Sequence, residues 1–178
     1  MKITSQEFET KVLDIDVAEI TRKLLELGAK KYSEVLMKRW VFDIDPSKDE
    51  WLRLRDDGQK ITLTYKCKSG FGIDQTEEIE VEIGDFQKTA EILSRLNFKG
   101  KYYQENKRIA FRLGDIEFTI DSWPKIPPYL EVESSDEEKV KEGLALLGLE
   151  NKDAGNLTVK EVYLRYGLDL HSFEELKF

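Results

Sequence analysis

Histidine and cysteine are almost missing from this 178-residue chain, which has one of each. The single cysteine, Cys67, excludes an intrachain disulfide and a metal site built on several cysteines. The single histidine, His171, argues against a histidine-based zinc site and against a Ser-His-Asp triad. We expect His171 to be a surface residue in a loop.

Long apolar runs are also absent, since none reaches the ~18 residues of a membrane span, and the N-terminus lacks the basic and apolar regions of a signal peptide. The net charge of −8 argues against nucleic acid and anionic membranes as partners. These features predict a cytoplasmic protein, and the length fits a single domain over residues 1–178. A homodimer stays open as the oligomeric state.

Charged residues, by contrast, are abundant at 36% of the chain, against ~25% in typical globular domains. Hydrophobic spacing predicts an α+β order of helices between runs of antiparallel strands. Eight such strands can close into a barrel. The expected strands are 2–12, 32–43, 51–55, 60–68, 76–83, 102–113, 115–121 and 129–133. The expected helices are 16–27, 86–96 and 135–147, followed by a C-terminal helical extension at 158–178.

Each expected strand has one apolar face and one charged face, because successive side chains on a strand point to opposite sides. The first strand puts Glu7, Glu9 and Lys11 on one face, a pattern that by itself equally fits a solvated surface. Later strands repeat this alternation of charged and apolar side chains. Their charged faces carry Arg53 and Arg55; Lys66 and Lys68; Glu78, Glu80 and Glu82; Arg108 and Arg112; Asp121; and Glu131 and Glu133.

Helices packed on the outside would cover the apolar faces, with Trp40, Phe42 and Trp51 in the core between sheet and helices. The charged faces would then line a closed or nearly closed eight-stranded antiparallel β-barrel, a tunnel. Charges in such an interior must be hydrated, paired or neutralised by a ligand. The alternative is a half-open sheet with one face in water. Segregation of arginine pairs and glutamate pairs on different strands favours a ligand.

The basic strands and the acidic strands suggest two different ligands. Guanidinium and ammonium groups suit a polyanion with several phosphates. Carboxylate pairs suit a hard divalent cation such as Mg²⁺ or Mn²⁺, which takes oxygen ligands. Together they predict a complex of metal and polyphosphate.

These residues resemble the CYTH domain family, the triphosphate tunnel metalloenzymes, which includes class IV adenylate cyclases and thiamine triphosphatases. The resemblance covers roughly residues 1–165. It rests on the opening Glu-x-Glu-x-Lys and the closing Glu-x-Glu, with the basic and acidic strands between them in the order of the family. The residues that carry it are Glu7, Glu9, Lys11, Arg53, Arg55, Lys66, Glu78, Glu80, Glu82, Lys107, Arg108, Asp121, Glu131 and Glu133.

The resemblance implies a role for each group of residues. The catalytic residues would be Glu7, Glu9, Lys11, Glu131 and Glu133. The metal, Mg²⁺ or Mn²⁺, would be held by Glu7, Glu9, Asp121, Glu131 and Glu133. Phosphate would be bound by Lys11, Arg53, Arg55, Lys66, Lys68, Arg108 and Arg112, with Glu78, Glu80 and Glu82 supporting these bases.

The activity expected from the resemblance is metal-dependent hydrolysis of a small-molecule triphosphate: inorganic tripolyphosphate, thiamine triphosphate or a nucleoside triphosphate. Two alternatives stay open. One is a class IV adenylate cyclase, which converts ATP to cyclic AMP and pyrophosphate. The other is a non-catalytic protein that binds polyphosphate.

Overall fold

A computed structural model describes residues 8–45, 50–68 and 76–178 of the chain. Glu7 lies outside the described residues, and so does the side chain of Lys68. Among the described residues no helix is both long and apolar enough to traverse a lipid bilayer.

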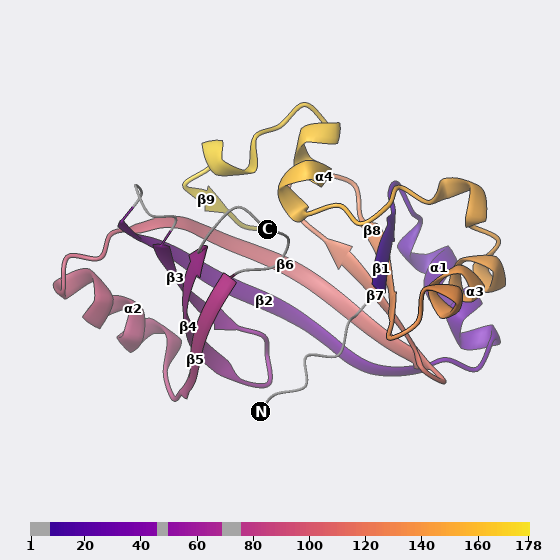
Figure 1. Ribbon diagram of the computed structural model, residues 1–178, viewed down its shortest axis with the longest axis horizontal. Coiled ribbons are helices and arrows are strands. Elements are labelled where there is room, and N and C mark those ends of the chain that lie inside the picture. Colours follow the sequence, from indigo (N-terminus) through magenta and orange to yellow (C-terminus); the bar gives the residue numbers. More distant parts are fainter. Residues whose placement is uncertain (1–7, 46–49, 69–75) are drawn as a thin grey trace. The chain divides into compact units, whose positions relative to one another are not determined.

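The observed elements follow the expected order (Figure 1). The strands are β1 (Phe8–Val12), β2 (Lys30–Asp45), β3 (Glu50–Asp56), β4 (Ile61–Lys68), β5 (Thr76–Ile83), β6 (Gly100–Leu113), β7 (Ile116–Ser122), β8 (Tyr129–Ser134) and β9 (Glu175–Leu176). The α-helices are α1 (Val17–Glu26), α2 (Phe86–Arg95), α3 (Glu137–Leu147) and α4 (Val159–Arg165), with short 3₁₀ turns η1 (Glu150–Lys152) and η2 (Leu170–Ser172). The prediction of an all-helical C-terminal extension is wrong beyond α4, because the chain there forms η2 and the short strand β9.

One sheet contains all the strands, in the order β1-β8-β7-β6-β2-β3-β4-β5, with β9 added to β6. The pairings described for β1 to β8 are antiparallel, and β9 runs parallel to β6. The order has two ends, β1 and β5, in the described part of the chain, so the sheet is not strictly closed. The predicted α+β fold with a nearly closed antiparallel sheet is thereby confirmed.

The chain divides into two compact units, which are described separately. The first unit comprises Met1–Val35 and Lys107–Leu170, and the second comprises Leu36–Asn106 and His171–Phe178. The long strands β2 and β6 contribute residues to both.

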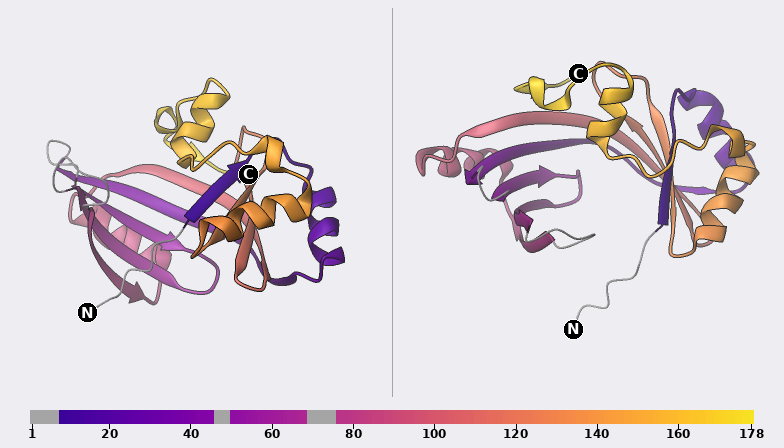
Figure 2. Two further views of the ribbon diagram at one scale, coloured as in Figure 1. Left: turned by 45° about the vertical axis from the view of Figure 1, so that its right-hand side comes forward. Right: turned by 45° about the horizontal axis from the view of Figure 1, so that its top comes forward.

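In the first unit, α1 and α3 lie side by side over the apolar face of β1, β7 and β8 (Figure 2). Val12, Phe118 and Val132 come from three neighbouring strands and are fully buried in this core. Leu24 of α1 and Leu144 of α3 pack against them. The predicted alternation is therefore confirmed here, and the polar side chains of these strands are left on the opposite face.

In the second unit, α2 packs on β3 and covers an aromatic core. Phe42 and Leu54 from the sheet meet Phe86 and Leu93 from the helix, and Trp40 packs against them. Helix cover is incomplete, because β5 leaves two apolar side chains in solvent, Ile79 at 62% and Val81 at 54% exposure. The expectation that helices cover every apolar strand face is wrong at β5, because Ile79 and Val81 lie outside the core that α2 covers.

Candidate functional site

The polar face of the first unit is assembled by strand register. Strand β8 pairs with β1 on one side and with β7 on the other. Lys11 of β1 stands opposite Glu131 of β8, and Glu9 stands opposite Glu133. Side chains in these positions are near neighbours across the ladder. Two motifs that are far apart in the sequence thus lie side by side in the sheet.

Three of these side chains, Glu9, Glu131 and Glu133, form a carboxylate cluster. Each offers an oxygen within 4.8 Å of the others. The ammonium group of Lys11 lies 2.7 Å from Oε2 of Glu131 and 3.3 Å from Oε1 of Glu9. Lys11 is only 3% exposed and Glu131 9%. Arg108 is a second cation beside the cluster, with Nη2 3.7 Å from Oε1 of Glu131. Hard oxygen donors at this spacing fit a divalent cation.

Arg108 and Asp121 form a bidentate ion pair beside the cluster. Nε and Nη2 of Arg108 lie 2.9 and 2.5 Å from the two carboxylate oxygens of Asp121, which is fully buried. Burial lowers the pKa of Arg108, but the hydrogen bond and the charge of Asp121 outweigh it and raise that pKa above its usual value. Asp121 lies outside the carboxylate cluster of the described residues. This position suits a residue that holds Arg108 in place, and it suits a metal ligand less well.

Tyr129 is a buried member of this face that the sequence reasoning missed. Its hydroxyl accepts a hydrogen bond from Nε1 of Trp123 at 3.1 Å. Burial and the nearby charges of Asp121 and Glu131 raise its pKa well above the usual value. The signal was present in the sequence, because Tyr129 has the same strand parity as Glu131 and Glu133.

The polar face of the second unit contains a cationic pocket of about 530 Å³. Register concentrates positive charge beside it, since Arg39 of β2 stands directly opposite Arg55 of β3. Like charges in facing positions are unfavourable unless something neutralises them. The pocket is lined by Arg39, Val41, Asp43, Glu50, Trp51, Arg53, Lys66, Lys101, Tyr102, Gln104 and His171.

Arg53 is the least satisfied of these cations. Its side chain is 19% exposed, and Nη2 is 3.9 Å from Oε2 of Glu80. Its Nε is buried and has no hydrogen-bond partner among the described residues. Burial lowers its pKa, opposed by the charges of Glu78 and Glu80. The partly exposed remainder of this guanidinium can face an anion in the pocket.

The acidic strand β5 holds the neighbouring bases in place. Lys66 forms an ion pair with Glu78, which stands opposite it. Thr64 donates a hydrogen bond of 2.8 Å to Glu80, and Lys60 lies 3.7 Å from the same carboxylate. The hydrogen bond from Thr64 lowers the pKa of Glu80 against the opposing effect of burial, with help from the charges of Lys60, Arg53 and Arg55. These contacts fit the supporting role predicted for the acidic strand.

The remaining predicted residues lie farther from these two groups or outside the described residues. Arg112 is mostly exposed, 2.8 Å from Oε2 of Glu117, and stacks over the ring of Tyr32. Arg55 is half-buried on the polar face of β3, and Glu82 is exposed opposite Thr62. Glu7 and the Lys68 side chain belong to the part that the structure does not describe.

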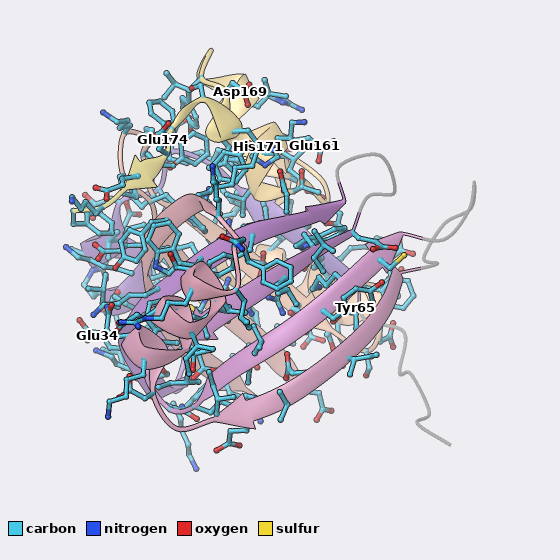
Figure 3. All side chains as sticks on the ribbon, turned by 90° about the vertical axis from the view of Figure 1, so that its left-hand side faces the viewer. Glu34, Tyr65, Glu161, Asp169, His171 and Glu174 are labelled. Atoms are coloured by element: carbon cyan, nitrogen blue, oxygen red, sulfur yellow. The ribbon has the colours of Figure 1, made fainter. Side chains whose placement is uncertain are left out.

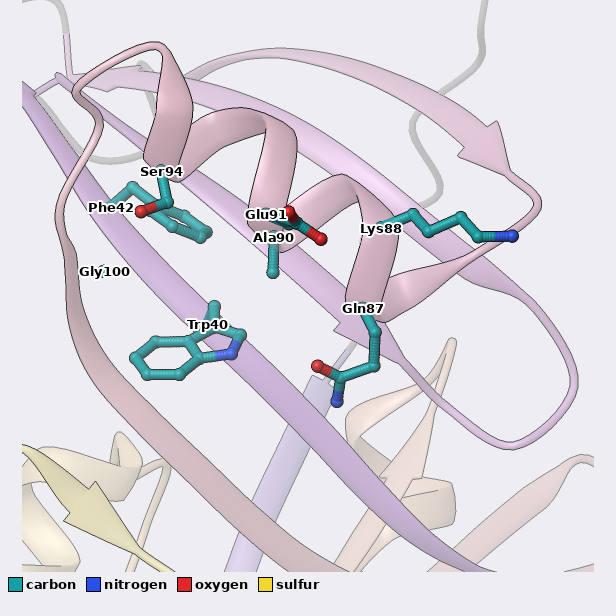
Figure 4. Close-up of a pocket in the computed structure, with 8 residues that line it drawn as sticks. All are labelled: Trp40, Phe42, Gln87, Lys88, Ala90, Glu91, Ser94 and Gly100. Carbon is teal, nitrogen blue, oxygen red and sulfur yellow. The ribbon is translucent and has the colours of Figure 1, made fainter.

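Another pocket, of about 400 Å³, lies between α2 and the aromatic side chains of β2 (Figure 4). Trp40, Phe42 and Gly100 line this pocket. The backbone of Gly100 lies so close to Trp40 that a Cβ at this position would be 2.7 Å from the Trp40 ring. None of the predicted site residues lines it.

Aromatic residues that were not expected in the site line the cationic pocket. Trp51 was expected in the core, although parity groups it with Arg53 and Arg55, and that parity was the usable signal. Tyr102 of β6 and His171 of η2 also line the pocket. His171 is exposed, as predicted.

The model of the CYTH domain family matches residues 5–156. This chain therefore belongs to the CYTH domain family. Enzymes of the triphosphate tunnel type in this family generally depend on a divalent metal, in keeping with the carboxylate cluster.

Relatives show the same fold. A Methanocaldococcus jannaschii protein named "Putative adenylate cyclase" is 33% identical over 134 residues, covering 72% of this chain and 77% of that protein. A conserved hypothetical protein from Pyrococcus furiosus is 25% identical, with a TM-score of 0.64 and coverage of 88% of this chain and 99% of that one. A Hippeastrum protein described as an adenylyl cyclase with a dominant triphosphatase activity is 19% identical, with a TM-score of 0.57 and coverage of 93% and 98%, and shows likeness of fold alone.

Proposed function

We propose that this protein is a divalent-metal-dependent enzyme that processes a triphosphate, and that the reaction is hydrolysis. One observation carries the proposal: strand register brings carboxylates together in the first unit and guanidinium groups together in the second. Register sets Glu9 against Glu133 in the first unit and Arg39 against Arg55 in the second. Carboxylates suit a divalent cation and guanidinium groups suit phosphate, which are the two components of a metal–triphosphate complex.

The carboxylate cluster would hold the metal, Mg²⁺ or Mn²⁺, and Glu7 would join it. When bound, such an ion neutralises phosphate charge and lowers the pKa of a water molecule. Lys11 lies between Glu9 and Glu131 and can keep these carboxylates apart and oriented. Because Lys11 is buried, its charge is poorly screened and can also attract a phosphate oxygen.

The cations of the second unit would bind the phosphate chain. Arg53 and Lys66 line the pocket, and Arg55 shares their face of the neighbouring strands β3 and β4. Guanidinium groups offer paired donors that match phosphate oxygens. Arg108, which Asp121 fixes by two hydrogen bonds, can stabilise charge that develops on phosphate without having to reorganise.

Adenylate cyclisation is the second candidate, favoured by the name of the relative that is 33% identical. In that reaction the ribose 3′ oxygen bonds to the α-phosphorus of ATP while the bond to the pyrophosphate leaving group breaks. The same cations would bind the leaving pyrophosphate. A non-catalytic polyphosphate binder is the third candidate, but it would have no need of the carboxylate cluster.

Product analysis separates these candidates. Purified protein is incubated with Mg²⁺ or Mn²⁺ and with tripolyphosphate, thiamine triphosphate or ATP, and the products are resolved by chromatography. We expect release of orthophosphate, and loss of that release in EDTA. Cyclic AMP with pyrophosphate would instead identify the cyclase, and tight binding without turnover would identify the binder.

The phosphate role of Arg53 is tested by Arg53→Met, which keeps the apolar stem and removes the charge. We expect the KM for the triphosphate to rise about tenfold, since hydrogen bonds to charged groups contribute about 1.5–3 kcal/mol. The control is Arg95→Met, because Arg95 is exposed on α2 and pairs only locally with Glu91. Equal KM values for both variants and the wild type would contradict the assignment.

A further inference from the structure

Two aromatic rings form a stacked pair on the wall of the cationic pocket. The ring centres of Tyr102 and His171 are 4.9 Å apart, and the ring planes differ by 16°. Tyr102 belongs to β6. His171, which is labelled in Figure 3, belongs to η2. The pair adds aromatic surface to the cationic pocket.

The segment that carries His171 is fixed against β6. The backbone N–H of Tyr103 donates a hydrogen bond of 2.8 Å to the carbonyl of Glu174. Strand β9 then pairs with β6 in parallel, and Leu176 is 1% exposed. His171 nevertheless remains exposed. The segment is thus anchored by its backbone and by Leu176, while the imidazole ring stays accessible at the pocket.

The pocket around this pair combines cations with flat rings. Lys101 lies 5.2 Å from the centre of the Tyr102 ring and 2.6 Å from Oδ2 of Asp43. Arg39 and Trp51 line the same pocket. Its volume of about 530 Å³ falls within the ~300–1,000 Å³ of small-molecule sites. Aromatic faces contribute little to a bare phosphate chain, but they stack well on flat heterocycles.

We propose that Tyr102 and His171 seat a flat heteroaromatic group of the substrate, so that the enzyme prefers an organic triphosphate to inorganic tripolyphosphate. This inference rests on the proposed function and specifies its substrate class. The group is either a nucleobase or the heterocycles of thiamine, which share the same stacking chemistry. If the ring pair served only to anchor the C-terminal segment, its loss would affect every substrate alike.

The test compares ATP, thiamine triphosphate and tripolyphosphate in steady-state kinetics with Mg²⁺ or Mn²⁺. We expect the wild type to show a lower KM for one of the two organic triphosphates than for tripolyphosphate. In His171→Ala, that KM should rise about tenfold, the size expected for losing a base–aromatic stack, while tripolyphosphate kinetics stay within twofold. His171→Phe keeps an aromatic ring and should restore most of the affinity, and Tyr102→Leu should behave like His171→Ala.

The control is Lys177→Ala, because Lys177 lies on the same segment but forms an exposed ion pair with Glu175. Thermal melting of every variant checks that the fold is kept. Equal losses on all three substrates, no loss in His171→Ala, failure of His171→Phe to rescue, or a wild-type preference for tripolyphosphate would each overturn the inference and leave the proposed function standing. A wild type that neither binds nor processes any of the three would overturn the proposed function itself.

Discussion

Glu131→Gln is expected to lower metal-dependent turnover by more than tenfold, and by about 100-fold at limiting metal. Glu131 is central to β8 and almost fully buried, and Oε2 lies 2.7 Å from the ammonium of Lys11. Glutamine keeps the shape and removes the charge. Substitution even of groups that only orient metal ligands commonly costs 10–100-fold, so loss of a carboxylate within the cluster should cost at least as much.

Two measurements separate this effect from a general loss of fold. Initial rates are recorded across a Mg²⁺ or Mn²⁺ titration, and Mn²⁺ affinity is measured by calorimetry without substrate. Glu142→Gln serves as control, since Glu142 is exposed on α3 and pairs with Lys139. We expect weaker Mn²⁺ binding and slower turnover in Glu131→Gln alone. Wild-type rates together with wild-type Mn²⁺ affinity would refute the metal assignment.

Strand parity alone assigns most of these side chains to the correct face of the sheet. It separates Glu9 and Lys11 from Val12, and Glu131 from Val132, because alternation follows from strand geometry and holds wherever one face is buried. The pairing of strands, unlike the direction of their side chains, cannot be read from alternation. That β1 lies against β8 depends on contacts between distant segments, which no local pattern encodes, and only the family resemblance linked the two glutamate motifs.

Residues of one parity can still have different roles. Asp121 shares the polar face with Glu131, and the family resemblance implies a metal-binding role for both. In the structure both oxygens of Asp121 are engaged by Arg108. The difference lies in side-chain direction and in the cross-strand partner, since Arg108 stands opposite Asp121 in the β6–β7 ladder.

Short and irregular segments were predicted least well. Strand β9 has two residues, too few to show alternation. The third helix starts later than the expected residue 135, because Asp136 caps α3 and Glu137 is its first residue. Neighbouring Ser and Asp residues are both good caps, and the choice between them depends on packing.

Asp121→Asn is expected to lower the free energy of unfolding by about 3 kcal/mol. Removing one partner of a buried ion pair costs about 3–5 kcal/mol because the other charge is left uncompensated. The lower end applies here, since Arg108 is 33% exposed while Asp121 is fully buried. Urea unfolding measures the change. Glu117→Gln is the matched control, because its pair with Arg112 is largely exposed and such pairs contribute only about 0–1 kcal/mol.

The double variant Asp121→Asn, Arg108→Met identifies the origin of that loss. If the cost arises from the uncompensated guanidinium, removing it should recover part of the stability, so the double variant should be less destabilised than the sum of the two single variants. Additive losses would show that Asp121 acts independently of Arg108. Recovery of stability without recovery of kcat would then separate the two roles of Arg108, one in holding Asp121 within the sheet and the other in binding phosphate.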